Sequence, residues 1–468
     1  MRKRWMCALG IWAAMVAAVL APCVSAWGQT VKAPVDPGVR GGPPGAGVPL
    51  SGLTQDELTF FTDGSNRFAD NEAVKGGTNN GLGPRFNSVS CLSCHSQPSP
   101  GGSSPPNNPS IAVATLNGAK NVVPWFITAN GPVREARFKR NPDGTNDGGV
   151  HDLFVITGRS DAAGCNIAQP DFLPAGNPVT GQGGNRNIVF RIPTPTFGAG
   201  LIEAIPDSAI LANIKADASQ KRAMRIGGHP NAHLSGTANR TANDGTITRF
   251  GWKAQNKSLL LFAAEAYNVE MGVTNQLFPQ ERDETPGCLF NATPEDTLNF
   301  TSSPNTDVLS DIEAFADFMR MLAPPTPAPD TSSTVNGRGT FTKIGCALCH
   351  TPSLTTGKMI ASGSPTSPSV ALSNQKANLF SDLLVHHMGE GLSDGITQGG
   401  AGPDEFRTAP LWGVGQRVFF LHDGRTSNLV AAIREHRSKG SEANMVIDRF
   451  NRLTAQEQQD LINFLRSL

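Results

Sequence analysis

The chain has 468 residues, enough for two or three domains that each bury a core. Charged residues make up 17%, with 39 basic against 39 acidic side chains, so charge gives no case for nucleic-acid binding. The 50 glycines and 35 prolines favour long irregular connections over a dense helical bundle. The one tyrosine, Tyr267, leaves almost no place for radical or acid chemistry through tyrosine.

The first 26 residues have the pattern of a secretory signal. Basic residues at positions 2–4 precede an apolar run, and the small residues 24–26 stand where a signal peptidase cuts. Pro22 interrupts the run near its end, and the run is short for a membrane span. The sequence therefore predicts export to the periplasm, with no membrane span left after cleavage.

The next elements begin with a linker and a helix. Residues 27–50 are rich in proline and glycine and predict a flexible arm. Thr54 and Glu57 then form a capping-box pattern, which predicts the start of a helix. A first Cys-x-x-Cys-His unit follows, and residues 111–300 alternate short apolar runs with turns, as expected for short strands and helices among long loops.

A second helical region precedes the clearest domain boundary. Apolar residues recur at helical spacing over 307–322, and the proline-rich run after it predicts a boundary near 325–335. The chain ends on another capping box, Thr454 with Glu457, and an apolar helical face. We therefore expect an N-terminal domain over 51–325, with a large loop-rich insertion, and a C-terminal domain over 335–468.

Two Cys-x-x-Cys-His units account for four of the six cysteines that lie beyond the leader. The pair left over, Cys165 and Cys288, would form a disulfide in an oxidising compartment, with two free thiols as the alternative. The units themselves comprise Cys91, Cys94, His95, Cys346, Cys349 and His350.

Three chemistries use such a unit, and covalent haem explains it best. A redox dithiol would leave the histidine incidental, and structural zinc needs four ligands where each unit offers three. Haem attachment explains every fixed position, because two thioethers fasten the porphyrin and the histidine binds the iron. The sequence thus predicts two covalently bound haems, with His95 and His350 as iron ligands.

Each iron then has a sixth ligand or an open position, and this decides between electron carrier and catalyst. Spacing alone does not choose a ligand, and each isolated histidine or methionine also has an ordinary structural interpretation. Candidates for the second haem are Met359, His386, His387, Met388, His422, His436 and Met445. Candidates for the first haem are His151, Met224, His229, His233 and Met271.

Several stretches resemble the bacterial di-haem oxidoreductase family, whose members are described as peroxidases and, earlier, as thiol oxidoreductases. The likeness runs from about residue 54 to the C-terminus, with the blocks in the family's order. The family is similar, more distantly, to di-haem cytochrome c peroxidases and to the enzyme that matures methylamine dehydrogenase. The blocks read GLGPRFNSVSCLSCH, GLIEAIPDSAIL, RFGWKAQNKSLL, MGVTNQLFPQE, FSDLLVHHMGEGLSDG and FRTAPLWGVGQRVFFLHDGRTSNLVAAIREH.

The resemblance implies an axial ligand for the second haem. In the peroxidases a similar His-Asp-Gly block is followed fourteen residues later by a distal methionine, and here His422 is followed at that offset by His436. We therefore expect His350 and His436 to ligate the second iron, with Met388 in reserve. The corresponding distal histidine of the first haem is absent, since that position holds Ile111. An open first haem, and hence a reactive one, is the hypothesis that follows.

Three further roles are expected near the haems. Glu203, in the apolar frame GLIEAIP, would move a proton during peroxide cleavage, or else form an ion pair with an arginine such as Arg249. Trp252 would relay electrons between the haems, or else pack in the core. Lys253 and Arg249 would hold haem propionates.

Together these observations predict a mostly α-helical exported protein with two cytochrome c-like domains. Its expected function is oxidoreductase: peroxide reduction, or dioxygen activation, at one haem, with the other haem passing electrons to or from a partner cytochrome or small redox protein. The alternative is a di-haem electron-transfer cytochrome without a catalytic site. Calcium occurs between the domains of the related peroxidases, but no ligand loop in this chain is specific enough to predict it.

Overall fold

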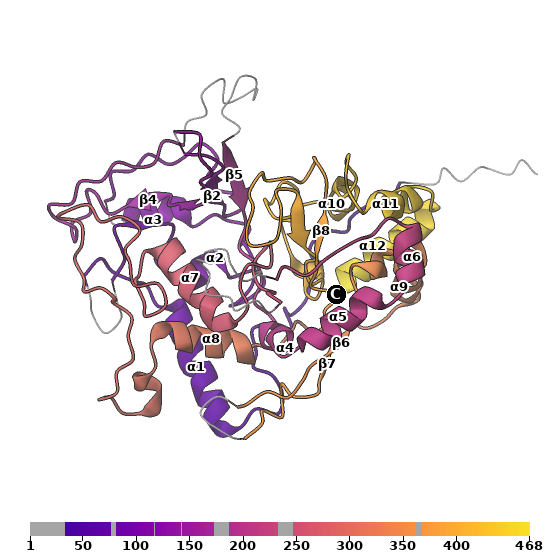
Figure 1. Ribbon diagram of the computed structural model, residues 1–468, viewed down its shortest axis with the longest axis horizontal. Helices are drawn as coiled ribbons and strands as arrows, with labels where there is room; N and C mark the ends of the chain where they lie inside the picture. Colours follow the sequence, from indigo (N-terminus) through magenta and orange to yellow (C-terminus); the bar gives the residue numbers. More distant parts are fainter. Residues whose placement is uncertain are drawn as a thin grey trace, which may run out of the picture. The chain divides into compact units, whose positions relative to one another are not determined.

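The computed structural model describes residues 33–75, 81–116, 118–141, 143–172, 187–232, 247–361 and 367–468. Within them, regular structure is mainly helical, and long irregular connections join the helices (Figure 1). The α helices are α1 (Gln55–Ala69), α2 (Cys91–Cys94), α3 (Ser110–Leu116), α4 (Ala199–Glu203), α5 (Asp207–Lys215), α6 (Ala218–Ala223), α7 (Leu259–Met271), α8 (Asp311–Met321), α9 (Ser332–Ile344), α10 (Leu429–Glu435), α11 (Asn444–Asn451) and α12 (Ala455–Ser467). Short 3-10 helices are η1 (Asn305–Val308), η2 (Cys346–Leu348) and η3 (Val414–Gln416).

The strands are two to four residues long and form four small antiparallel sheets. Three of these sheets are two-stranded, and the other has the order β3-β2-β5, with Ala136 paired to both His151 and Phe190. The strands are β1 (Arg85–Phe86), β2 (Glu135–Phe138), β3 (Val150–His151), β4 (Phe154–Val155), β5 (Ile188–Arg191), β6 (Leu354–Thr355), β7 (Lys376–Ala377), β8 (Val385–His387) and β9 (Glu405–Arg407). The expected short strands among loops are therefore present between residues 111 and 300.

Two large hydrophobic cores and two small clusters organise the described part of the chain. The first core gathers α1, α4, α7 and α8, and the second gathers α9, α10, α11 and α12. Each also takes residues from beyond the predicted boundary, such as Trp412 in the first core and Met224 in the second. The division into domains near 325–335 stays a prediction.

Each core is built on a pair of helices that meet at a glycine. In the first core α1 packs on α8 (Figure 1), and a Cβ at Gly64 would collide with the carbonyl oxygen of Ala314. In the second core α9 packs on α12, and a Cβ at Gly337 would collide with the carbonyl oxygen of Asp460. Only glycine allows backbones to approach so closely. A Cys-x-x-Cys-His unit follows the first helix of each pair, so the sequence repeat coincides with a repeated arrangement of helices.

Helix ends follow the local sequence. Both predicted capping boxes, Thr54 with Glu57 and Thr454 with Glu457, are present and are confirmed. The helix expected over 307–322 instead consists of η1 and α8. The break falls at Ser310, which forms its own capping box with Glu313.

The arm expected to be flexible has hydrogen-bond partners over residues 34–50. The Asp36 carboxylate accepts hydrogen bonds from Arg466 Nε at 2.7 Å and from the backbone amide of Leu429 at 2.6 Å. The amide of Leu50 donates to the Met321 carbonyl at 2.8 Å. Polar groups of this part thus have specific partners, residues 27–32 lie outside the described residues, and the flexibility of the arm stays a prediction. No helix in the described part of the chain is long and apolar enough to cross a membrane.

Candidate functional site

Two pockets contain the two Cys-x-x-Cys-His units. The first pocket, of about 100 Å³, is lined by Cys91 and His95 together with residues of α7 and α8. The second pocket, of about 210 Å³, is lined by Cys346, Cys349 and His350 together with residues of α10, α11 and α12. Each unit thus faces a cavity walled by the helices of its own core.

The histidine of each unit presents one ring nitrogen to its pocket. His95 Nδ1 lies 3.0 Å from the Gly102 carbonyl oxygen, and His350 Nδ1 lies 3.0 Å from the Phe380 carbonyl oxygen. A nitrogen that donates to a carbonyl carries the ring proton, so in His350 it leaves Nε2 as the electron-pair donor, whereas the His95 ring makes a further hydrogen bond to the Thr194 backbone. Burial lowers the pKa of His95 and of His350 to about 4, so both rings are neutral, which is the form that binds a metal.

The cysteines of the units are free thiols, in contrast to the remaining pair. Cys165 and Cys288 form the predicted disulfide, which is confirmed. Burial raises the pKa of Cys94 to about 11 and that of Cys346 to about 12. Redox dithiols depend on a lowered thiol pKa, so these environments disfavour the dithiol interpretation.

His436 lies with His350 in the second pocket. It follows α10, and its Nδ1 lies 2.8 Å from the Ala432 carbonyl oxygen, again leaving Nε2 unprotonated. Burial lowers the pKa of His436 as well. Both imidazoles therefore line the same pocket, and the lowered pKa of each favours the neutral ring. The structure brings together the pair that the resemblance implies.

The other candidates for the second iron are placed less favourably. His422 lines the second pocket but stacks on Phe406, with ring centroids 4.2 Å apart. Met388, the reserve ligand, lines it too, whereas His387 bonds Asp404 at 3.0 Å at the surface. Two remaining methionines lie outside the pocket lining: Met359 packs on the first core and Met445 is partly exposed.

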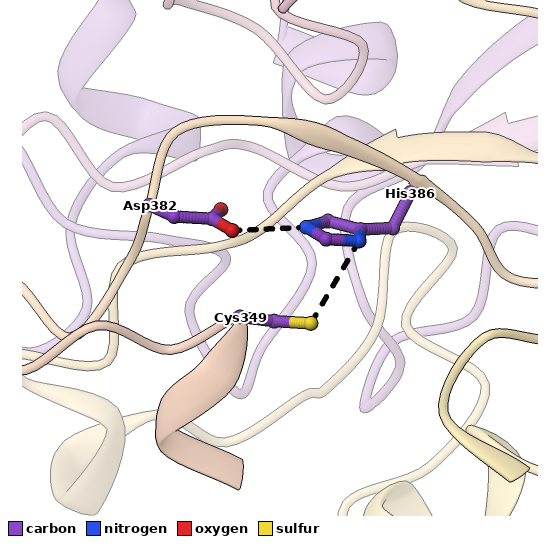
Figure 2. Close-up of side chains that lie close together, drawn as sticks. All are labelled: Cys349, Asp382 and His386. Carbon is purple, nitrogen blue, oxygen red and sulfur yellow. Dashed lines mark hydrogen bonds and ion pairs between the residues drawn. The ribbon is translucent and has the colours of Figure 1, made fainter. Parts of the chain in front are cut away.

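His386 belongs to a buried cluster beside Cys349 (Figure 2). The His386 ring bonds Asp382 through Nε2 at 3.0 Å and Glu442 through Nδ1 at 2.8 Å, and Cys349 Sγ lies 3.7 Å from Nδ1. Burial alone would lower the pKa of His386, but Cys349 and Asp382 raise it well above its ordinary value. Cys349, Asp382 and His386 have the spacing of a metal site. However, both ring nitrogens are already engaged, so His386 has no free nitrogen for iron.

Buried arginines without anionic partners fit a group that carries carboxylates. Arg407 and Arg417 line the second pocket, and burial lowers the pKa of each to about 10. Arg417 Nε and Nη2 have no hydrogen-bond partner within the described part of the chain. A buried cation of this kind is costly unless an anion joins it, and haem propionates are such anions. The donor set and these arginines therefore fit haem.

The two cations expected to hold propionates have other partners. Lys253 is fully buried, where it donates to the carbonyls of Gly402 and Glu405, each at 2.8 Å, and pairs with Asp394 at 3.1 Å. Arg249 bonds the Ile205 carbonyl and the Asp207 carboxylate. That expectation is corrected, because neither side chain is among the pocket linings and internal partners take up its charge.

Glu203 is also placed away from the pockets. Its carboxylate pairs with Arg320 Nε at 2.8 Å and accepts from the amide of Leu259, the first residue of α7, at 2.7 Å. The structure thus gives Glu203 an ion pair, the alternative considered for it, although the partner is Arg320 rather than Arg249. Neither pocket lining includes Glu203, and its catalytic role stays a prediction.

Trp252 stands at the junction of the pockets. Its side chain is 8% exposed and lines both pockets and a third, smaller cavity between them. The indole Nε1 donates to the Ile192 carbonyl at 2.9 Å, and Arg417 lies over the ring at 5.9 Å. The core and relay interpretations are therefore compatible, because a buried and fixed indole separates the two cavities.

The first pocket contains acidic side chains that sequence reasoning missed. Glu135, Glu265 and Glu270 all line it. Burial, and then the charge of Glu135, raise the pKa of Glu270 to about 8. Such a carboxyl holds its proton at neutral pH and is suited to proton transfer. The only signal in the sequence is the position of Glu270 in α7, a helix of mostly apolar residues that also contains Glu265 and Asn268.

Among the described lining residues of the first pocket, His95 is the one histidine. Met271 lines this pocket, His151 bonds Asp147 at 2.8 Å outside it, and His229 bonds Glu405 at 2.7 Å. Met224 is buried in the second core, and His233 lies outside the described residues. The structure thus gathers no second histidine of the described chain at this pocket.

Comparison with known proteins identifies the family. The model of the family described as "Di-haem oxidoreductase, putative peroxidase" matches residues 184–468. No curated protein matches the chain.

Solved structures give weaker matches. The MauG-like protein associated with microbial copper homeostasis is 17% identical over 34% of this chain and 52% of its own, with a TM-score of 0.22. The diheme peroxidase BthA of Burkholderia thailandensis is 16% identical over 47% of this chain and 65% of its own, with a TM-score of 0.29. Hydrazine synthase of Kuenenia stuttgartiensis is 15% identical over 94% of this chain and 99% of its own, with a TM-score of 0.33. These TM-scores are too low to carry an argument. The match of the family model, over more than half of the sequence, shows that this chain belongs to the di-haem oxidoreductase family.

Proposed function

We propose that this di-haem oxidoreductase is an exported c-type enzyme that reduces peroxide, or activates dioxygen, at its first haem. Cys91 and Cys94 would hold that haem through thioethers, and Cys346 and Cys349 would hold the second. Electrons would reach the first haem through the second, from a partner cytochrome or small redox protein. The leader-like residues 1–26 support a periplasmic location.

One observation carries the proposal: each Cys-x-x-Cys-His unit faces its own pocket, and the two pockets share Trp252 as a wall. A fixed indole between two redox groups shortens the distance that electrons must cross. The arginines of the second pocket, Arg407 and Arg417, are placed to receive propionates next to that indole.

The division of roles follows from the residues in each pocket. The second pocket has both His350 and His436 in its lining, which supports a closed, six-coordinate centre for electron transfer. The first pocket offers His95 together with Glu270, whose raised pKa keeps it protonated, which supports the reactive centre. When bound, haem supplies an iron that exchanges electrons with a small oxidant.

Glu270 takes the proton-transfer role in this proposal. Peroxide cleavage requires one proton to leave the proximal oxygen and another to reach the leaving oxygen. Glu270 lines the pocket with a pKa raised to about 8, so at neutral pH its carboxyl would give that proton and take it back. Glu270→Gln is expected to slow the reaction with peroxide about 10²–10⁴-fold while leaving haem content unchanged.

The test compares two double variants with the unaltered protein, all matured in a host that attaches c-type haem. Cys91→Ser with Cys94→Ser should remove one covalent haem, as measured by haem staining of a denaturing gel and by intact mass. Cys346→Ser with Cys349→Ser should remove the other. An unaltered protein that shows no haem stain contradicts covalent attachment.

Spectra of the resting protein distinguish the enzyme from its rival, an electron-transfer cytochrome. We expect one high-spin haem that responds to cyanide, azide and peroxide, and this signal should vanish with Cys91→Ser and Cys94→Ser. Two low-spin haems that ignore all three ligands would instead identify an electron carrier.

A further inference from the structure

The single tyrosine of the sequence lies in the wall of the first pocket. Tyr267 belongs to α7 and is 2% exposed. It lines the pocket together with Cys91, His95 and Glu270. The proposed proton transfer by Glu270 makes no use of this phenol, so its position calls for a separate explanation.

Two carboxyl groups meet the phenol oxygen. Tyr267 Oη lies 3.0 Å from Asp311 Oδ2 and 3.1 Å from Glu72 Oε1. A phenol has one hydrogen and donates to one acceptor at a time, so the second contact requires a protonated carboxyl. Burial, and then the charge of Asp311, raise the pKa of Glu72 to about 8, which makes Glu72 the protonated partner. Glu72 therefore donates to the phenol oxygen, and the phenol donates to Asp311.

Asp311 forms an ion pair with an arginine. Its carboxylate lies 2.8 Å from Arg67 Nη1, and Arg67 Nε lies 3.0 Å from Asp63. The group that accepts the phenol proton is thus the Asp311 carboxylate, which is paired with Arg67. Arg67 is in turn paired with a second carboxylate, that of Asp63. Burial, and then Asp311, hold the pKa of Tyr267 well above its ordinary value, so the phenol is neutral at rest.

Aromatic contacts connect this phenol to the expected iron ligand. The ring of Tyr267 meets Phe315 edge-on at 5.1 Å between centroids, and Phe315 meets Phe68 at 6.4 Å. Phe68 in turn lies 6.1 Å from the His95 ring. The phenol is therefore packed into the same aromatic group as the imidazole of the first unit.

We propose that Tyr267 is a redox residue that gives one electron to the oxidised first haem and is restored by the next electron that arrives. This inference rests on the proposed function, in which peroxide is the two-electron oxidant. The phenol loses one electron to the haem centre and its proton to Asp311 Oδ2, and a neutral phenoxyl radical remains. When an electron returns through the second haem, Asp311 gives the proton back.

The surroundings of Tyr267 favour this step. An oxidised phenol is a strong acid, so its oxidation is easiest where a proton acceptor is already hydrogen-bonded to it. Asp311 is such an acceptor at 3.0 Å, and the O–H of Glu72 stabilises the phenoxyl oxygen afterwards. Near-complete burial keeps the radical away from solvent.

The experiment uses the holoprotein, since a chain with one tyrosine gives an unambiguous isotope label. Protein grown with ring-deuterated tyrosine and unlabelled protein are mixed with hydrogen peroxide, frozen within milliseconds and compared by electron paramagnetic resonance. We expect a radical signal whose proton hyperfine structure collapses on deuteration. Tyr267→Phe, which keeps the ring contact with Phe315, should lack the signal. Asp311→Asn should lower its yield at least tenfold.

A second oxidant separates this inference from the proposed function. Flash-generated tris(bipyridine)ruthenium(III) oxidises the protein without peroxide. If ruthenium produces the tyrosyl signal and peroxide leaves both haems unchanged, the peroxidase proposal fails and the redox role of Tyr267 is supported. If peroxide oxidises the haems but no radical signal responds to deuteration or to Tyr267→Phe, the role of Tyr267 is overturned. A signal that follows deuterated tryptophan instead overturns it as well.

Discussion

Three histidines in the two pockets share one arrangement. His95, His350 and His436 each place Nδ1 within 3.0 Å of a backbone carbonyl oxygen, and each lines a pocket. The carbonyl fixes the tautomer and the orientation of the ring, and it makes Nε2 a better donor. The protein thus places Nδ1 of all three rings in the same way, although His436 stands outside a Cys-x-x-Cys-His unit.

Replacing His436 by methionine tests the ligation of the second haem. A thioether favours ferrous iron more than an imidazole does, so His436→Met should raise the reduction potential of one haem by a substantial part of the ~0.8 V that axial ligands span. Spectroelectrochemistry of the holoprotein measures the change, and His387→Gln, at the surface, serves as the control. Unchanged potentials of both haems would refute the assignment.

Residue roles were predictable where the chemistry is local and unpredictable where it depends on distant neighbours. The two Cys-x-x-Cys-His units are contiguous, so the sequence alone indicates them. Glu203 is flanked by apolar residues along the chain, but its ion-pair partner Arg320 lies 117 positions away. The local sequence therefore does not reveal this ion pair. Glu270 and Arg417 acquire their unusual environments only when separate segments meet, and nothing next to them in the sequence announces this.

The same kind of helix contact occurs beside each pocket. The helix pair α1–α8 meets at Gly64 and the pair α9–α12 meets at Gly337. Each contact sets how close two helices approach, and therefore where the following Cys-x-x-Cys-His unit lies relative to the second helix. An aromatic ring of the first helix faces the histidine in both cases: Phe68 at 6.1 Å from His95, and Phe341 at 6.3 Å from His350.

Two alanine substitutions in α9 test this contact. Gly337→Ala places a methyl group against the backbone of Asp460 and should destabilise the protein by about 1–3 kcal/mol. Gly339→Ala, two residues on, meets open space and should stabilise the helix by about 0.5–1 kcal/mol. Urea unfolding of the two holoproteins measures both changes. Equal effects of the two substitutions would contradict the close approach.

The sequence indicated those elements whose signals are short-range. Both capping boxes lie within four residues, and both were predicted correctly. Residues 34–50 contain proline and glycine but few apolar residues, so they resemble a linker. Their order comes from groups far along the chain, as in the pairing of Asp36 with Arg466, which no local pattern reveals.

At the scale of the whole molecule, buried carboxyl groups dominate the expected pH dependence. Burial is the first cause that raises the pKa of Glu72, Glu270 and Glu295 to about 8 and that of Asp296 to about 7. Each holds a proton in the folded state that it loses in the unfolded state above about pH 4.5. The stability that these groups contribute is therefore complete below that pH and is lost as the pH rises through 7 and 8.

Glu270→Gln isolates one of these groups. The amide does not titrate, so between pH 5 and pH 8 the free energy of unfolding of the variant should fall less steeply than that of the unaltered protein. The slopes should differ by up to about 1.4 kcal/mol per pH unit. Denaturant unfolding of both holoproteins at several pH values provides the comparison, and Glu390→Gln, an exposed ion-pair partner of Lys439, is the control. Parallel curves would show that Glu270 ionises normally.

The segment 34–50 determines how the protein would respond to pulling. Along the segment, the first of these contacts is the ion pair of Asp36 with Arg466 of α12. The amide of Arg40 then donates to the Gly415 carbonyl, and the amide of Leu50 donates to the Met321 carbonyl. A force applied at the amino end therefore loads the final helix of the chain before it reaches α8. In an optical trap, the second core should yield before the first, although it is the later one in sequence.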